Sequence, residues 1–194
     1  AGLGGLAGLA MAAALLSRGG RRYDTLSTRL DSAIVERVEH ASESVLRSRP
    51  HGVPVAVFDV ITGLSGTGRY LLERRHSEPC RSALEQVLRA FVYLSELGAD
   101  AVPHWHTSSR HTTENLRTAH PDGNVNLGMA HGLPGPLALL SLSASHGLEV
   151  AGQREGDPAH GGRHRHRHLA PDRGDGAERD LRGQDRIHPQ VGIG

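Results

Sequence analysis

Polar and apolar residues alternate with a helical period through the first part of the chain. From Tyr23 to Arg47, apolar residues follow one another at steps of three or four, the spacing of an amphipathic helix. Pro50 ends this pattern, because the residue before a proline disfavours the helical conformation. The positions expected to face inward are Leu26, Leu30, Ile34, Val38, Ala41 and Val45.

A second amphipathic helix is predicted from Ser82 to about Leu97, and Gly98 is its expected end. Two sets of residues could form its inward face. They are Leu84, Leu88 and Phe91, or Val87, Val92 and Leu94.

Three Gly-Leu-x-Gly strings each open a more uniformly apolar stretch. They occupy residues 5–8, 63–66 and 132–135, at spacings of 58 and 69 residues. Glycine at a helix start lets the helix pack closely on another backbone. A unit that recurs at such a period is typical of architectures in which neighbouring units cover one another. The sequence therefore predicts an all-α protein in which glycine-led helices alternate with longer amphipathic ones in layers.

Two segments do not follow this alternation. Residues 53–61 (VPVAVFDVI) have the composition of a strand, although their length fits a buried connector equally well. Residues 100–125 are polar and rich in His, Thr and Ser, which indicates a long functional loop. The loop histidines lack the helical i, i+4 spacing of a metal-ligand pair, so a solvated loop is expected.

The composition changes after Gln153, which predicts a boundary between residues 1–153 and 154–194. The second part has no aromatic residue and no helical or strand period, so it cannot bury enough apolar surface to fold. We expect a disordered or out-of-frame tail, because a GC-rich gene read in another frame gives this mixture of Arg, Gly, Asp, His and Pro. The HRHRH string at 164–168 resembles a metal-binding tract only by composition.

Charge and cysteine content exclude several classes of protein. The net charge is +1 and all 22 basic residues are arginine, so no strong field attracts nucleic acid or an anionic membrane. The one cysteine, Cys80, excludes a disulfide framework and a thiolate-rich metal site from this chain alone; we expect an incidental thiol in a turn between two helices. The apolar residues 1–16 are too few to span a membrane, and arginines follow rather than precede them, so a cytoplasmic protein is expected.

Two residues are candidates for chemistry. Asp59 lies among apolar residues, where a buried carboxylate needs partners. It could fix the turn at residues 63–66, or it could orient a catalytic group. His131 precedes a glycine-led helix and could exchange a proton near neutral pH, or it could be a core histidine bonded to a carbonyl.

Two long segments carry a family resemblance. FDVITGLSGTGRYLL (58–72) and PDGNVNLGMAHGLPGPLALLSL (121–142) closely resemble the signature segments of the LanC-type lanthionine cyclases, and VPHWHT (102–107) looks like a loop of that family. The resemblance covers about residues 3–153. It implies an α/α toroid, a ring of helical hairpins in two concentric layers, of which roughly the first half would be present here.

The resemblance also implies a reaction. A cysteine thiol of a dehydrated lanthipeptide precursor adds to a dehydroalanine or dehydrobutyrine of the same peptide and closes a thioether ring. Zn²⁺ activates that thiol in the family. By match to the family's motifs, His131 would be the proton donor or acceptor and Asp59 a supporting or proton-handling group. A lanthipeptide dehydratase is a possible partner.

The segments that carry the family's zinc ligands, two cysteines and a histidine, have no counterpart in this chain. We therefore expect a truncated and frameshifted family member that binds no catalytic zinc and is inactive alone. One alternative is a peptide-binding remnant without chemistry. Another is a carbohydrate-active α/α toroid, which needs paired acidic residues, and Asp59 has no evident acidic partner.

Overall fold

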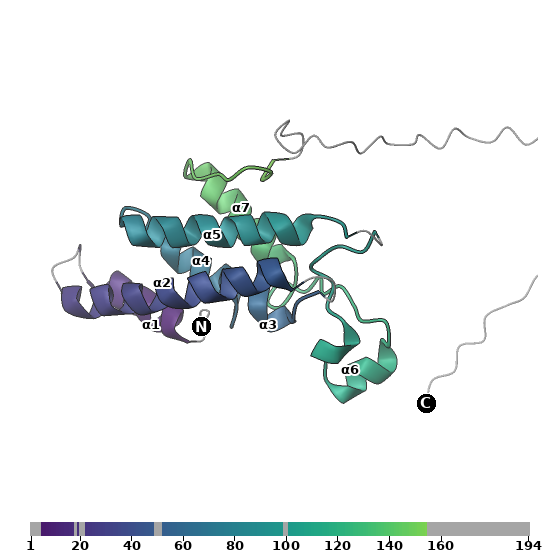
Figure 1. Ribbon diagram of the computed structural model, residues 1–194. Helices are drawn as coiled ribbons and strands as arrows, with labels where there is room; N and C mark the ends of the chain where they lie inside the picture. The colour runs from purple at the N-terminus through teal and green to yellow at the C-terminus, as the bar shows by residue number, and fades with distance from the viewer. Residues whose placement is uncertain (1–4, 18, 20–21, 49–51, 99–100, 155–194) are drawn as a thin grey trace, which may run out of the picture. The chain divides into compact units, whose positions relative to one another are not determined.

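The computed structural model describes residues 5–17, 19, 22–48, 52–98 and 101–154, and this part of the chain is helical (Figure 1). The chain divides into residues 1–161 and 162–194, and the second unit lies outside the described residues. The helices are α1 (Leu6–Leu16), α2 (Asp24–Arg47), α3 (Val55–Phe58), α4 (Leu64–Glu73), α5 (Glu78–Ser95), η1 (Ser109–His111), α6 (Glu114–Ala119) and α7 (Pro134–Ser145). The described residues contain isolated bridges but no named strand, which confirms the predicted all-α class.

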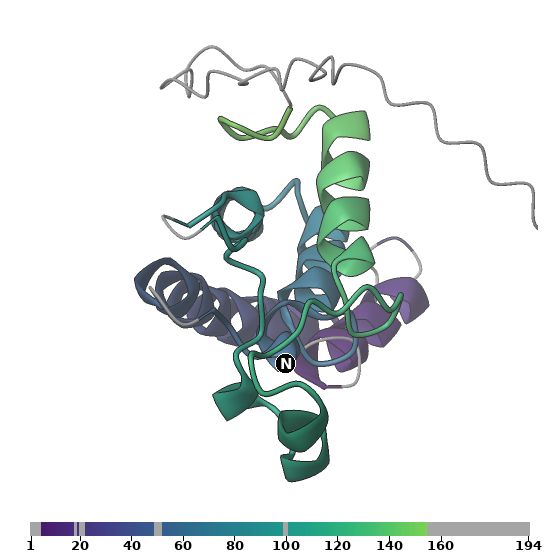
Figure 2. The ribbon, with the colours of Figure 1, turned by 90° about the vertical axis from the view of Figure 1, so that its right-hand side faces the viewer.

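The glycine-led helices and the amphipathic helices form different layers. Figure 2 shows α2 and α5 on one side of the first unit, with α1, α4 and α7 on the other. Helix α4 contacts α1 and α7, and both α2 and α5 pack against this inner row. Each predicted Gly-Leu-x-Gly string lies at the start of an inner helix. The layered alternation predicted from the sequence is therefore confirmed.

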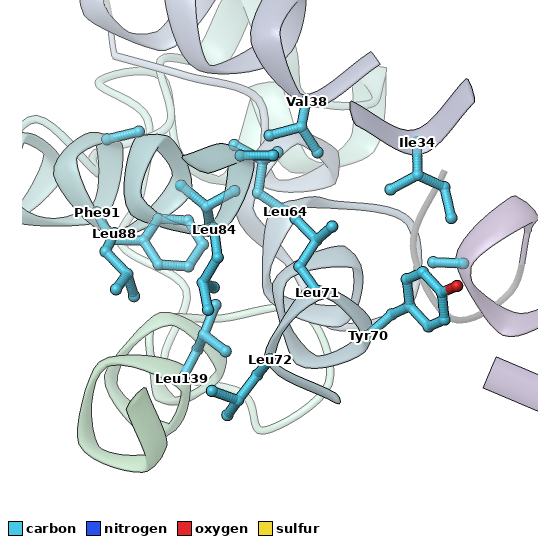
Figure 3. Packing of buried hydrophobic residues seen from close by; sticks show 14 of the residues in the cluster. Ile34, Val38, Leu64, Tyr70, Leu71, Leu72, Leu84, Leu88, Phe91 and Leu139 are labelled. Carbon is cyan, nitrogen blue, oxygen red and sulfur yellow. The ribbon is translucent and has the colours of Figure 1, made fainter. Parts of the chain in front are cut away.

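Helix α4 is the centre of the hydrophobic core. Tyr70, Leu71 and Leu72 are almost fully buried at successive positions, because α4 has a neighbour on each side. Figure 3 shows these side chains beside Ile34 of α2, Leu84 and Leu88 of α5 and Leu139 of α7. Both inward sets predicted for α5 are buried: Leu84, Leu88, Phe91, Val87, Val92 and Leu94.

A buried polar network joins the two layers. The Tyr70 hydroxyl donates to Asp31 Oδ1, and the Arg74 guanidinium donates to Asp31 Oδ2 through Nε (3.1 Å) and Nη2 (2.7 Å). Burial and the hydrogen bond to Asp31 raise the pKa of Tyr70, so the phenol stays protonated. The carboxylate of α2 thus has partners for both oxygens, as a buried charge requires.

Three sequence predictions need correction. Leu26 is 42% exposed, because the buried face of α2 passes through Ser27 and Asp31 instead. Helix α5 begins at Glu78 rather than Ser82, with Pro79 in its first turn, where a proline is tolerated. Cys80 therefore lies inside α5, fully buried, and not in a turn between helices.

The two segments that lie outside the predicted helical alternation are connectors. Residues 53–61 contain the four-residue helix α3 followed by bends, so the strand-like composition reflects burial of Val53 and Phe58 rather than sheet pairing. The described residues 101–125 form a loop with the short helices η1 and α6. Thr107 pairs with Gly52 and Asn124 and donates its hydroxyl to the carbonyl of Val53 at 3.0 Å, which fixes the loop beside α3.

The tail expected to be disordered, the HRHRH string and most of the segment beyond the predicted boundary at Gln153 lie outside the described residues. Among the residues that are described, none of the helices is both long enough and apolar enough to cross a bilayer.

Candidate active site

Asp59 occupies a tight turn between α3 and α4. Its side chain is 2% exposed, and three groups of the following residues donate to its Oδ1 atom: the Thr62 amide (2.6 Å), the Thr62 hydroxyl (3.0 Å) and the Gly63 amide (2.8 Å). Aspartate favours such turns because its short side chain can accept from amides just ahead of it. The turn at Gly63 is therefore built around this carboxylate.

Glycine at position 63 is required by space. A Cβ there would lie 2.6 Å from the Asp59 nitrogen and 2.7 Å from the Val57 carbonyl group. The Ser65 hydroxyl of α4 donates to the Phe58 carbonyl at 2.5 Å and closes the turn from the other side. The start of α4 is thus anchored to the end of α3.

His131 lies in a second tight loop, just before α7. The Gly132 amide donates to the Gly128 carbonyl (2.7 Å) and the Leu133 amide to the Asn126 carbonyl (2.9 Å). A Cβ at Gly132 would lie 2.4 Å from the Asn126 oxygen, so this position also needs glycine. The loop folds back on itself and presents the imidazole at its outer edge.

The two loops meet. The Val60 amide donates to the Ala130 carbonyl at 3.1 Å, and His131 Nδ1 lies 2.6 Å from Asp59 Oδ2. An ionised carboxylate can only accept, so Nδ1 carries the proton of this hydrogen bond. The two candidate residues are therefore in direct contact, and Nε2 is the nitrogen of the neutral ring that carries no proton.

The surroundings keep Asp59 ionised. Burial of the carboxyl group by itself raises its pKa. The hydrogen bonds from His131, from the amide and hydroxyl of Thr62 and from the Gly63 amide outweigh burial, and they hold the pKa of Asp59 below its ordinary value of 3.8. A negative charge is thus fixed behind the imidazole at neutral pH.

The imidazole itself is accessible. The His131 side chain is 57% exposed, whereas its partner Asp59 is almost completely buried. An apolar groove of about 160 Å³ lies between α4 and α7, with Val60, Met129, Leu139 and Leu142 in its walls and Arg69 beside them. Val60 and Met129 belong to the two loops that form the pair, so the groove adjoins these loops, although Asp59 and His131 themselves are not among its lining residues.

The sequence singled out Asp59 and His131 as candidates and offered a role for Asp59 in fixing the turn at residues 63–66, which the bond from the Gly63 amide agrees with, but it did not point to Thr62 or Ser65. Thr62 and Ser65 stand in the segment that resembles the family signature, yet neither residue type signals a role by itself. An Asp followed by Thr-Gly at the third and fourth positions is the one local signal for the turn.

Helices pack in two layers, and the imidazole of His131 meets the carboxylate of Asp59 between two loops that require glycine. This arrangement is that of a partial α/α toroid with a candidate proton-transfer site. The chain belongs to the lanthionine synthetase C-like protein family, whose model matches residues 1–155. It is similar in fold to the solved structure described as nisin cyclase, with a TM-score of 0.67 and 23% sequence identity over 77% of this chain. The match spans only 36% of nisin cyclase. No curated protein matches the chain significantly.

The family resemblance implies a zinc ion, which needs several His, Cys, Asp or Glu ligands close together. Among residues 5–154 as far as they are described, no three His, Cys, Asp or Glu side chains come together as possible ligands. Cys80 is fully buried, and burial raises the pKa of its thiol, which disfavours the thiolate that zinc binds. The described residues therefore do not fit a zinc ion.

Proposed function

We propose that this chain carries the proton-transfer site of a lanthionine cyclase, with His131 as the catalytic acid and base and Asp59 as its supporting carboxylate. The observation that carries the proposal is the 2.6 Å contact between His131 Nδ1 and Asp59 Oδ2 at a site where the imidazole remains accessible. Membership in the lanthionine synthetase C-like family supports the class of reaction.

The reaction is the addition of a peptide thiol to a dehydroalanine or dehydrobutyrine. A sulfur–carbon bond forms at Cβ, the carbon–carbon double bond is lost, and its electron pair moves into an enolate. The thiol proton goes to a base, and the enolate takes a proton at Cα, so that the product is an isomer of the open peptide. General acid–base catalysis of such transfers contributes about 10²–10⁴-fold.

His131 suits both transfers. With Nδ1–H donating to Asp59, the neutral ring has its lone pair on Nε2 and can accept the thiol proton there. The imidazolium that results lies against a carboxylate whose pKa is held low, so its charge is compensated. The same Nε2 proton can then pass to the enolate, which returns the ring to its starting state.

The groove between α4 and α7 supports a peptide as the substrate. Its walls are mainly apolar, and Leu127 and Met129 are exposed within the loop of His131. An extended peptide could place an apolar residue in the groove while its dehydroamino acid faces the imidazole. Dehydration of Ser or Thr in the same peptide is the class of reaction that supplies such a substrate, and a dehydratase would catalyse it. The cytoplasmic location of the chain remains a prediction.

The isolated chain is expected to be inactive on an ordinary cysteine thiol, because its pKa of about 8.5 leaves little thiolate at neutral pH and the described residues offer no zinc ligands. A thiol of low pKa, ionised at pH 7, removes that requirement. Such a thiolate brings no proton to His131, so the buffer must protonate Nε2 before that atom can deliver a proton to the enolate. The test is therefore the addition of an aromatic thiol to a short apolar peptide that contains dehydroalanine, followed by loss of free thiol with and without the chain.

We expect the chain to accelerate this addition by at least about 10²-fold over buffer, the lower end of the range for general acid–base catalysis. His131→Asn should abolish the acceleration, and His146→Asn, which changes another exposed histidine beyond α7, should retain it. Equal rates with and without the wild-type chain would contradict the proposal. Peptide binding without acceleration would favour a binding remnant.

A further inference from the structure

The two oxygens of Asp59 have separate tasks. Oδ1 accepts from three donors within residues 62–63, whereas His131 is the one partner of Oδ2 seen in the described part of the chain. A carboxylate torsion is broad and nearly two-fold, so an unrestrained group would exchange its oxygens freely. The donors on Oδ1 remove that freedom.

Thr62 supplies two of these three donors. Its amide lies 2.6 Å and its hydroxyl 3.0 Å from Oδ1. The hydroxyl also lies 3.4 Å from the carbonyl oxygen of Ala56, but the carboxylate is closer and charged, so it is the stronger acceptor for the single hydroxyl proton. The side chain of Thr62 therefore adds to the turn a hydrogen bond that the backbone cannot provide.

We infer that Thr62 is a positioning residue for the Asp59–His131 pair: its hydroxyl holds Oδ1 so that Oδ2 faces His131 Nδ1 and fixes the proton on that nitrogen. The inference rests on the proposed function, because only there does the position of the ring proton matter. A neutral imidazole with its proton on Nδ1 presents Nε2 as an acceptor to the substrate, and the other tautomer presents a donor.

The expected effect on the His131 ring proton depends on the hydroxyl group of Thr62 and not on the shape of its side chain. Thr62→Val has nearly the same shape and keeps the amide donor, but it removes one of three hydrogen bonds to a charged group. Thr62→Ser keeps the hydroxyl on a smaller side chain. A role limited to filling space would make Thr62→Val the milder change, whereas the positioning role makes Thr62→Ser the milder change.

The test is nitrogen NMR of the His131 ring in the labelled full chain, at a pH where the spectra show the ring to be neutral. We expect the wild-type ring to hold its proton on Nδ1, with widely separated signals for the two nitrogens. In Thr62→Val the separation should shrink, and the Nδ1 proton should exchange with water at least about tenfold faster, as expected for a lost hydrogen bond to a charged group. Thr62→Ser should restore both properties.

Thr118→Val is the matched control, because the hydroxyl of Thr118 donates within the exposed helix α6. Amide spectra report whether each variant is folded, and Thr62→Ala is a second variant without the hydroxyl if Thr62→Val does not fold. Wild-type ring signals and exchange in a folded, hydroxyl-free variant would overturn the inference.

Asp59→Asn separates this inference from the proposed function. If Asp59→Asn changes the ring signals and the hydroxyl-free variants do not, Thr62 has no positioning role and the pair stands. If Asp59→Asn leaves the ring signals unchanged, the pair itself does not set the tautomer, and both the inference and the mechanism proposed for His131 fail.

Discussion

Gly63 packs directly against the backbone of Val57, so that a Cβ at position 63 would lie 2.7 Å from the Val57 carbonyl oxygen. Real Cβ atoms do not approach a backbone oxygen so closely, and neither partner here is a flexible side chain. The turn that holds Asp59 depends on this contact.

Gly63→Ala should therefore destabilise the chain by about 2 kcal/mol, the usual cost of forcing an extra carbon into a packed site. Chemical denaturation of both proteins measures the difference in the free energy of unfolding. Gly128→Ala is the control, because a Cβ there meets only the side-chain oxygen of Asn126, at 3.1 Å. Equal losses in the two variants would argue against the close contact.

Asp59 makes the stability of the chain depend on acidity. Its pKa in the folded chain lies below the ordinary 3.8, so the unfolded chain takes up this proton first as the pH falls. The stability that Asp59 contributes is therefore complete above about pH 4 and is lost as the pH falls through the lowered folded value.

Asp59→Asn should cost about 2 kcal/mol at pH 6, because it takes the charged acceptor away from the buried Gly63 amide and from the donors of Thr62 and His131. The difference from wild type should narrow by pH 3. Urea unfolding at both pH values tests this, with Asp122→Asn, an exposed aspartate, as the control. A difference independent of pH would contradict the lowered pKa.

The buried network of Tyr70 and Asp31 predicts a cost for removing one hydroxyl. Tyr70→Phe deprives Asp31 of a donor in a buried position, which should lower the free energy of unfolding by about 1–2 kcal/mol. Tyr23→Phe, at the exposed start of α2, should change it by less than about 0.5 kcal/mol. Similar values for the two variants would show that the network contributes little.

Cys80 should be unreactive in the folded chain. The thiol is fully buried in α5, and burial raises its pKa, so both access and thiolate content are low. A thiol-specific chromogenic reagent should label it slowly in buffer and rapidly in urea. Labelling in buffer at the rate of a free cysteine would contradict the burial of this side chain.

Zinc titration of the metal-free chain, followed calorimetrically, should detect no tight site with one zinc per chain, because the described residues hold no suitable set of ligands. A variant with His164, His166 and His168 replaced by Ala is the control for weak binding by that tract. A tight stoichiometric site that survives in this variant would refute the prediction.

Sequence periodicity was sufficient for the two long amphipathic helices, and the Gly-Leu-x-Gly strings marked the starts of α1, α4 and α7. The patterns around Ile34 and Leu84 predicted α2 and α5, because long amphipathic helices repeat their buried positions many times. A four-residue helix such as Val55–Phe58 has no such repetition, and its apolar composition is shared by strands and buried connectors. The exposed Leu26 shows that the edge of a buried face depends on the neighbouring helix rather than on spacing.

The site could be predicted only in part. Asp59 and His131 are 72 positions apart, and no local pattern relates them. Each was a candidate because of its own neighbours in the sequence, the family resemblance implied their roles, and the structure places them in contact. The role of Thr62 depends on which oxygen of Asp59 each donor reaches, which is a property of the folded turn. Residue types alone could not distinguish that arrangement from an ordinary turn.

The role of His131 is tested most directly by the stereochemistry of the product that forms from the dehydroalanine peptide and the aromatic thiol. An enolate protonated by solvent takes the proton on either face, whereas delivery from His131 Nε2 reaches one face of a bound peptide. We expect a clear excess of one Cα diastereomer with the wild-type chain, and with His131→Asn the same ratio of diastereomers as in buffer alone. The buffer ratio with both proteins would contradict this role of His131.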